Sequence, residues 1–390
     1  MNGSNIFRFL QGDRLIWLVV FMLIAFSMLG IYSSTSTLAF RMQGGNTEYY
    51  VMKQFFYVLI GLALMFVTHL VDYRYYSRIA QVLWLICIPL LIYTMFFGTE
   101  INSASRWITV PLVGLTFQTS DLAKLGLIMY LARQLSLKQD NISDFKQSFL
   151  PILAPTVITT LLVAPDNLST ALIILFTGVF VMFIGRISLK HIGLFCGAAT
   201  LVMALFVMLL FVMPESMLKG RMKTWKHRIE NFKQSGENVD DDYQAMQAKI
   251  AIAKGGLFNI NPGGSNQKNF LPHPYSDFIY AIIIEEYGLL GGALIVCLYL
   301  FFLYRCIRIV LKAPKAFGAF LAVGLGIALV IQAMINMAVV VNLVPVTGVT
   351  LPLVSMGGSS AIFTSIAFGI ILSVSRNVEL QSGNEDLALG

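Results

Sequence analysis

Long apolar runs alternate with short polar connections along nearly the whole chain. About ten of these runs can be drawn as helices, and they cover 15–34, 54–71, 79–97, 117–135, 148–164, 168–184, 189–213, 278–304, 317–342 and 355–375. A helix of roughly 20 apolar residues crosses the ~30 Å hydrocarbon core of a bilayer. The pattern therefore predicts an all-α, polytopic integral membrane protein with about ten transmembrane helices.

The composition supports this interpretation. Of the 390 residues, 57% are hydrophobic and only 12% are charged, whereas a soluble domain carries about 25% charged residues. The mean hydropathy is +0.76, and together these values exclude a soluble globular enzyme. The sequence contains no C-x-x-C pair and no histidine cluster, so we expect neither a disulfide framework nor a structural zinc site.

The basic residues predict the orientation. The short loops on one side hold only Arg41, Lys53 and Arg106. The opposite loops and both termini hold Arg8, Arg14, Arg74, Arg78, Arg133, Lys138, Lys146, Arg186, Lys190, Arg305, Arg308, Lys312, Lys315 and Arg376. Because short cytoplasmic loops are enriched in Lys and Arg, this bias places both termini in the cytoplasm. The net charge of +7 is then a membrane feature, and we expect no nucleic-acid partner.

One long connection, 214–277, falls on the extracytoplasmic side in this topology. It opens with a basic, amphipathic stretch at 219–228 and has a Gly/Pro/Asn turn at 255–265. A connection of this length is usually functional or disordered, and its aromatic residues and turn signals argue against plain disorder. We predict one transmembrane domain over 1–380, which includes this loop, and a cytoplasmic tail at 381–390.

Ionisable residues inside the apolar runs need a reason, because a charge at membrane depth costs several kcal/mol. Asp121 and Lys124 are three residues apart, and Ser120 and Lys124 are four apart, so one helix face carries all three. Two interpretations are open. The Asp–Lys pair neutralises itself near the interface, or Lys124 faces a cavity that receives an anionic ligand.

Glu285 and Glu286 lie about two turns into the run 278–304, and no basic residue is near them in sequence. We expect them either to pair with a cation from another helix, such as Lys124 or Arg106, or to line a hydrated cavity.

Asp277 stands where the long loop enters the run 278–304, after Leu-Pro-His-Pro-Tyr-Ser. A carboxylate there favours the helix macrodipole by ~0.3–1 kcal/mol, and flanking prolines would also suit it to act as a general base. Arg106 and Lys268 could supply cations for a phosphate on the same side, although Arg106 could equally snorkel to the interface.

The connection 343–354 carries no charge, yet it contains Pro345, Gly348 and Pro352 and leads into Ser-Met-Gly-Gly-Ser-Ser at 355–360. Irregular backbone at membrane depth is tolerated only where it is buried or lines a cavity. The Gly-Gly-Ser-Ser run could bind an anion through backbone N–H groups, or it could pack closely against another helix.

Five motifs in order resemble those of one family. Segments 105–108, 117–124, 164–171, 271–278 and 344–360 are similar to R-W-I, F-Q-P-S-E-x-x-K, E-P-D-L-G-T-A, L-P-E-x-H-T-D-F and L-P-x-x-G-x-x-L-P-x-x-S-Y-G-G-S-S. On these motifs the chain resembles the SEDS family of membrane proteins, the FtsW/RodA group, over nearly its whole length. The chain departs from the family pattern at Thr119, Asp121 and Met356. The form around Asp277 is closer to the cell-division branch than to the elongation branch.

The resemblance implies a peptidoglycan glycosyltransferase. Such proteins polymerise lipid II, an undecaprenyl-diphosphate-linked substrate, at the outer face of the bacterial cytoplasmic membrane. They act with a class B penicillin-binding protein and, in septal synthesis, with other divisome membrane proteins. The resemblance also implies a divalent cation, Mg²⁺ or Mn²⁺. A lipid II flippase and a non-catalytic scaffold for the transpeptidase are the alternatives.

The resemblance also implies roles for individual residues. Asp277 falls on the family's essential aspartate, the base for the acceptor 4-hydroxyl. Lys124 and Arg106 fall on cavity positions that would stabilise a diphosphate. The remaining candidate substrate contacts are Gln118, Ser120, Lys268, Glu285, Glu286, Ser355 and Ser359.

Overall fold

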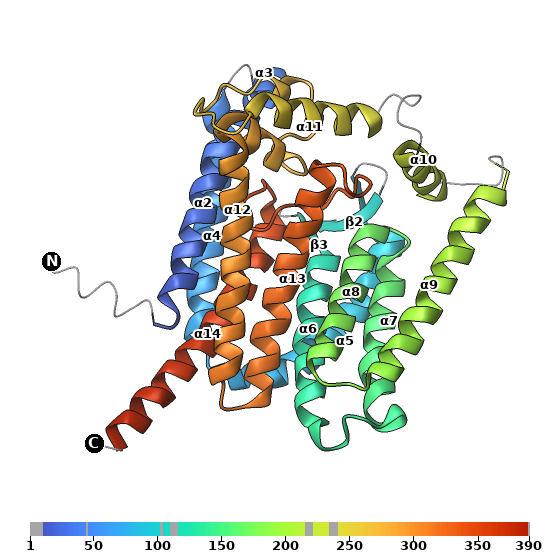
Figure 1. The fold of residues 1–390 in the computed structure, drawn as a ribbon, viewed down its shortest axis with the longest axis vertical. Helices are drawn as coiled ribbons and strands as arrows, with labels where there is room; N and C mark the ends of the chain where they lie inside the picture. The colour runs from blue at the N-terminus through green and yellow to red at the C-terminus, as the bar shows by residue number, and fades with distance from the viewer. Residues whose placement is uncertain are drawn as a thin grey trace.

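The structure is a computed structural model that describes residues 11–43, 46–101, 104–109, 116–214, 221–233 and 241–388. Long helices run side by side along the molecule, and shorter elements, among them α3, α10 and α11, gather at one end (Figure 1). The start of α2 and the end of α14 lie at the opposite end. The described ends of the chain thus share one end of the bundle, and their position relative to a membrane stays a prediction.

Each predicted apolar run overlaps one long helix. The helices are α2 (Arg14–Ser34), α4 (Thr47–Leu70), α5 (Tyr73–Phe97), α6 (Thr119–Leu137), α7 (Leu150–Val163), α8 (Leu168–Ile184), α9 (Leu189–Val212), α12 (Ile279–Lys312), α13 (Ala316–Val340) and α14 (Gly358–Ala388). Within the described residues, 8 helical spans are long and apolar enough to cross a membrane. The chain is therefore a multi-pass membrane protein, and the exact number of ten spans stays a prediction.

The two remaining runs, those of α8 and α6, do not meet this criterion of length and apolar composition. Helix α8 has only 17 residues, and α6 carries Asp121, Lys124 and Arg133. Helix α14 continues past the predicted end at 375 and into the predicted tail at 381–390. The division of the chain into a domain and a tail stays a prediction.

Shorter elements connect the long helices. They are α3 (Ser36–Gln43), β1 (Thr99–Ile101), β2 (Ala104–Thr109), β3 (Thr116–Gln118), η1 (Gln139–Asn141), η2 (Phe145–Phe149), α10 (Arg221–Lys233), α11 (Asp241–Gly255) and η3 (Gln267–Asn269). The strands form a small antiparallel sheet in the order β1-β2-β3. The apolar pattern did not predict this sheet, because strands of 3 residues, such as β1 and β3, are too short to show a period.

The core has two parts around α13. One cluster of buried side chains joins α2, α12, α13 and α14, and the other joins α5, α6, α7 and α8. Helix α9 differs, since only Ile192 and Leu210 are buried along it, and it stands apart from the other helices in Figure 1. Many large apolar side chains on the outer faces are exposed, as expected for surfaces that contact lipid.

A kink in α12 joins the long connection to the bundle. Gly288 has φ 70° and ψ −178°, a backbone conformation that only glycine adopts readily. At the kink, Leu289 N donates to Gly256 O at 2.9 Å, and a Cβ on Gly288 would lie 2.6 Å from Leu257 O. The segment that follows α11 is thereby fastened to α12 two residues after Glu286.

Candidate active site

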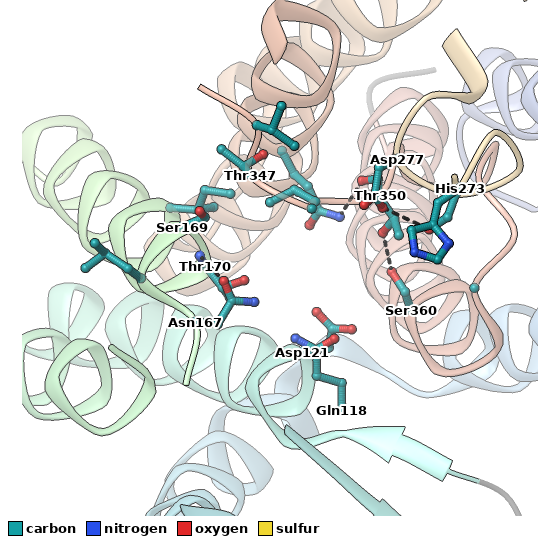
Figure 2. A pocket seen from close by; sticks show the side chains of 18 of the residues that line it. Gln118, Asp121, Asn167, Ser169, Thr170, His273, Asp277, Thr347, Thr350 and Ser360 are labelled. Carbon is teal, nitrogen blue, oxygen red and sulfur yellow. Dashed lines mark hydrogen bonds between the residues drawn. The ribbon is translucent and has the colours of Figure 1, made fainter. Parts of the chain in front are cut away.

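A polar cavity of about 520 Å³ lies at the end of the bundle that carries α10 and α11. Asn167, Ser169 and Thr170, around the start of α8, lie on one side of it, and His273 and Asp277 lie on the other (Figure 2). The sheet, α6, α13 and the start of α14 complete the wall. Of the predicted site residues, Gln118, Lys124 and Asp277 line this cavity.

Asp277 is held in the cavity wall through its main chain. Its carboxylate accepts a hydrogen bond from Ser276 Oγ at 2.9 Å, and its carbonyl accepts one from Asn336 Nδ2 at 2.9 Å. Ser355 Oγ donates to Ser276 O at 2.6 Å, and Met356 N donates to Tyr275 O at 2.8 Å. These contacts leave the Asp277 carboxylate at the cavity surface with a fixed backbone.

Gly348 approaches Asp277 from the connection before α14. Its φ is +67°, and a Cβ placed on it would lie 3.5 Å from Asp277 Oδ2. Residues 346–350 line the cavity, while Leu351, Leu353 and Val354 are buried. The uncharged irregular connection is therefore buried in part and faces the cavity in part, as the sequence predicts.

Lys124 lines the same cavity as Asp277. Its ammonium is 3.7 Å from Asp121 Oδ1 and donates a hydrogen bond to Gln332 Oε1. Both Asp121 and Lys124 line the cavity. The structure thus shows both the Asp121–Lys124 ion pair and the position of Lys124 in a cavity wall, while binding of an anionic ligand there stays a prediction.

The predicted serines support the wall rather than line it. Ser120 accepts a hydrogen bond from Gln118 Nε2 at 2.7 Å, and Ser359 Oγ accepts one from Gln118 N at 3.3 Å. Ser120, Ser355 and Ser359 are all buried. They hold the cavity-facing residues Gln118 and Ser276 in place.

The Gly-Gly-Ser-Ser run alternates between the cavity and the packed interior. Gly357 and Ser360 line the cavity, whereas a Cβ on Gly358 would lie 2.9 Å from the ring of Tyr57. Close packing thus explains Gly358, and the first turn of α14 presents its N-terminal end to the cavity, where an anion is favoured.

The structure does not bring Glu285, Glu286 or Lys268 to the cavity. Glu285 accepts hydrogen bonds from Ser265 Oγ and, at 3.1 Å, from Asn266 N. Glu286 accepts hydrogen bonds from Ser33 Oγ and, at 3.3 Å, from Ser265 N. Lys268 Nζ donates to Gly263 O at 2.8 Å. The expected pairing of the two glutamates with Lys124 is wrong, because Lys124 contacts Asp121 and Gln332 instead.

These carboxylates instead fasten the segment 263–267 to α12, which allows a prediction. Glu285→Gln should accelerate amide hydrogen exchange at Asn266 and Gln267 by about 10- to 100-fold, because a hydrogen bond to a charged group contributes about 1.5–3 kcal/mol. Glu48→Gln is the matched control, since Glu48 is an exposed acid in the first turn of α4. Equal exchange rates in the wild type and Glu285→Gln would contradict this role.

Arg106 lies in β2, but its side chain is outside the described part of the structure. Its neighbour Trp107 lines the cavity and pairs with Gln118 in the sheet. A role for Arg106 toward a phosphate stays a prediction.

Several cavity residues were not predicted from the sequence. They are Asp166, Asn167, Arg221, Trp225, Gln244, His273, Tyr275 and Gln332. Asp166 and Asn167 belong to the motif at 164–171, and Arg221 and Trp225 belong to the basic stretch of the long connection. The signal for Gln332 was an amide in an apolar run, four residues before Asn336, which by itself does not say which way the side chain points.

Tyr275 is outside the membrane-spanning helices, and burial raises the pKa of its phenol, with Tyr50 and Asp277 adding to the effect. The phenol therefore stays protonated at neutral pH and remains a hydrogen-bond donor beside Asp277.

An apolar groove of about 730 Å³ adjoins the polar cavity. It runs between α8, α9 and α13 and is closed at one end by Trp225 and Ile229 of α10. The two spaces share the lining residues Leu168, Ser169, Ile173, Trp225, Val346 and Thr347. A molecule with a charged part and a long apolar part could therefore occupy both spaces at once.

The described residues contain no group of three or more His, Cys, Asp or Glu side chains that could hold a metal ion. Magnesium is often bound by one or two carboxylates together with phosphate oxygens. Asp121, Asp166 and Asp277 line the cavity as individual carboxylates and do not form a cluster of ligands. The predicted divalent cation thus stays untested by the geometry.

These features define a class of protein, a multi-pass helical membrane protein whose polar cavity opens onto an apolar groove. The chain belongs to the cell cycle protein family of FtsW, RodA and SpoVE, whose family model matches residues 13–380. The family resemblance seen in the five motifs is thereby confirmed.

Relatives match the chain over nearly their whole length. Stage V sporulation protein E of Bacillus subtilis is 35% identical over 369 residues, which are 93% of this chain and 97% of that protein. The probable peptidoglycan glycosyltransferase FtsW of Geobacter sulfurreducens is 32% identical over 381 residues, which are 97% of this chain and 98% of that protein.

Solved structures share the fold. A chain of a peptidoglycan synthase complex aligns with a TM-score of 0.73 at 24% identity and covers 94% of this chain and 98% of its own length. The rod shape determining protein RodA of Thermus thermophilus aligns with a TM-score of 0.66 at 23% identity, covering 94% of this chain and 97% of its own.

Proposed function

We propose that this chain is a peptidoglycan glycosyltransferase that polymerises lipid II into glycan strands, in septal wall synthesis during cell division. The observation that carries the proposal is that one cavity holds a carboxylate, Asp277, and a cation, Lys124. A glycosyl transfer from a diphosphate needs both, one for the attacking hydroxyl and one for the leaving group. The relatives named as peptidoglycan glycosyltransferases support the same activity.

Asp277 is the general base in this proposal. Its carboxylate takes the proton of the acceptor sugar 4-hydroxyl as that oxygen attacks the anomeric carbon of the donor sugar. The bond from the anomeric carbon to the diphosphate oxygen breaks, and undecaprenyl diphosphate leaves with the electron pair. The fixed backbone of residues 275–277 supports this role, because a general base must lie within hydrogen-bond reach of the proton that it removes.

Lys124 and the first turn of α14 bind the diphosphate, both in the bound substrate and as it leaves. The Lys124 side chain is only 14% exposed, and electrostatic stabilisation by its ammonium is stronger there than in water. Backbone N–H groups at the start of α14 add partial positive charge near Gly357 and Ser360.

The apolar groove takes the undecaprenyl chain. It opens directly from the polar cavity and is bounded by α9, which is loosely packed against the rest of the bundle. The undecaprenyl chain moves there from lipid to an apolar wall, so the groove contributes through packing contacts and not through removal of surface from water. A substrate with a diphosphate between a sugar and a polyprenyl chain matches this two-part site.

The surroundings of the enzyme are also part of the proposal. The positive-inside bias supports a multi-pass protein of the bacterial cytoplasmic membrane with both termini in the cytoplasm. A structural neighbour comes from a complex that coordinates polymerization and crosslinking, which supports a class B penicillin-binding protein as partner, alongside other divisome membrane proteins. A divalent cation, Mg²⁺ or Mn²⁺, would bind mainly through the oxygens of the diphosphate.

Purified chain, reconstituted with its transpeptidase partner, should convert lipid II into glycan strands visible on a gel, and chelation with EDTA should slow the reaction. The partner is included because polymerisation and crosslinking enzymes work as a complex in the structural neighbour. Movement of lipid II across vesicles without polymer would identify a flippase instead. Strands formed only by the partner would identify a scaffold, and either result would overturn the proposal.

A further inference from the structure

Two amide side chains interrupt an otherwise apolar helix at the centre of the bundle. Within α13, only Gln332 and Asn336 carry a side-chain nitrogen or oxygen. They are four residues apart and therefore share one face of the helix. Their exposed fractions are 4% and 1%, and buried amides at membrane depth are costly unless they are hydrogen-bonded.

Gln332 connects the cavity cation to the connection before α14. Its Oε1 accepts a hydrogen bond from Lys124 Nζ, and its Nε2 donates to Thr350 O at 3.0 Å. Since Asp121 lies 3.7 Å from the same ammonium, Gln332 and Asp121 together restrict where Lys124 can point.

Asn336 links Asp277, the proposed base, to the same segment before α14. Its Nδ2 donates to Asp277 O at 2.9 Å and to Val349 O at 2.7 Å. The amide therefore ties the main chain of the base to the residue that follows Gly348, whose backbone lies against the Asp277 carboxylate.

The two amides, one helical turn apart on α13, thus donate hydrogen bonds to the neighbouring carbonyls of Val349 and Thr350. The hydrogen bonds form one continuous path from Lys124 through α13 and residues 349–350 to Asp277. Because α13 is buried on nearly all sides, this path has a rigid support.

We propose that Gln332 and Asn336 are positioning residues that set the cation and the base relative to each other. Gln332 presents the Lys124 ammonium to the diphosphate, and Asn336 presents the Asp277 carboxylate to the acceptor hydroxyl. This inference rests on the proposed glycosyl transfer. The two amides then have different tasks. Gln332 acts through substrate binding, and Asn336 acts through the chemical step.

A purely structural role predicts something different. Amides that only joined helices would lower the stability of the bundle when replaced, and the kinetic constants per folded molecule would stay unchanged. Gln54 is the matched control, because it is a buried amide in α4 with an exposed fraction of 1%. It donates to Ser27 Oγ at 3.2 Å and does not line the cavity.

The test measures kcat and KM for lipid II with the partnered complex, normalised to folded protein by size-exclusion chromatography. Gln332→Met should raise KM about 10-fold with kcat within about 2-fold, since a hydrogen bond to a charged group is lost. Asn336→Leu should lower kcat by about 10- to 100-fold with KM nearly unchanged, because the base is displaced from its hydroxyl. Gln54→Met should change neither constant.

The near-isosteric pair Gln332→Glu and Asn336→Asp keeps the test decisive if the apolar variants fold poorly. Asn336→Asp has no N–H group to donate to either carbonyl, so it should lower kcat as Asn336→Leu does. Gln332→Glu places a second carboxylate on Lys124 and should raise KM above that of Gln332→Met. Kinetic constants like those of Gln54→Met in all four variants would overturn the inference.

A second readout does not depend on turnover. Binding of undecaprenyl diphosphate should weaken about 10-fold in Gln332→Met and stay unchanged in Asn336→Leu. Equal binding by Gln332→Met and the wild type would overturn the role of Gln332. A wild-type complex that bound this lipid but made no glycan would instead remove the proposed function.

Discussion

Replacing Asp277 with Asn should reduce lipid II polymerisation by about 10²- to 10⁴-fold, the range that a positioned general base contributes. The amide keeps the size of the carboxylate but cannot accept the proton of the acceptor hydroxyl. The main-chain contacts of Asp277 with Asn336, and of Ser276 with Ser355, remain available. The variant should therefore fold, insert and bind lipid II, and gel analysis of the glycan product would show the loss.

The matched control for this substitution is Asp72→Asn. Asp72 caps α5, where its Oδ1 accepts a hydrogen bond from Arg74 N at 2.9 Å, and asparagine caps helices equally well. It does not line the cavity, so polymerisation should be that of the wild type. Wild-type polymerisation by Asp277→Asn would remove Asp277 from the chemistry.

Replacing Lys124 with Met should lower kcat/KM for lipid II by about 10²-fold or more, since a charged contact to the leaving diphosphate contributes several kcal/mol in a cavity shielded from water. The substitution also leaves Asp121, 12% exposed, without its ion-pair partner. An unpaired buried charge is destabilising, so the melting temperature should fall together with the activity.

A double variant separates these two effects. Asp121→Asn combined with Lys124→Met removes the unpaired charge and should restore the melting temperature without restoring polymerisation. Recovery of both quantities would show that Lys124 matters only for folding. Lys124→Arg keeps the charge and should retain more activity than Lys124→Met.

Much of the fold could be predicted because lipid imposes a simple rule. Each backbone polar group must be satisfied within its own helix, so a membrane helix reads as one apolar run. Helix α8 was located to the residue, and α2 and α9 to within one residue at each end. The kink at Gly288 was not predicted because it leaves the apolar run unbroken, and the three-stranded sheet was not predicted because its strands are too short to show a period.

The site could be predicted only in part. Asp277 and Lys124 stood out because each is a charge at the edge of, or inside, an apolar run, and both line the cavity. Glu285 and Glu286 had the same signal, yet they fasten the segment 263–267 instead. Sequence could not separate these cases, because the N–H groups that bind the glutamates come from a loop whose path follows no periodic pattern.

The helices of the long connection show the same limit. The stretch 219–228 was predicted to be amphipathic and basic, and its described part, from Arg221 onward, forms the start of α10. That Arg221 and Trp225 line the cavity depends on how α10 packs against α9 and α11, and no local pattern encodes that packing. Gln332 and Asn336 likewise became interpretable only once α6, α13 and the connection 346–350 were placed together.

The stoichiometry of the reaction is the most direct test of the proposed glycosyl transfer. Purified complex, with the transpeptidase activity of the partner blocked, would be given lipid II, and both released undecaprenyl diphosphate and new glycosidic bonds would be counted. We expect one diphosphate released for each bond formed by the wild type, and neither product from Asp277→Asn. Release without glycosidic bonds in the wild type, or equal amounts of both products from Asp277→Asn, would contradict the role assigned to this cavity.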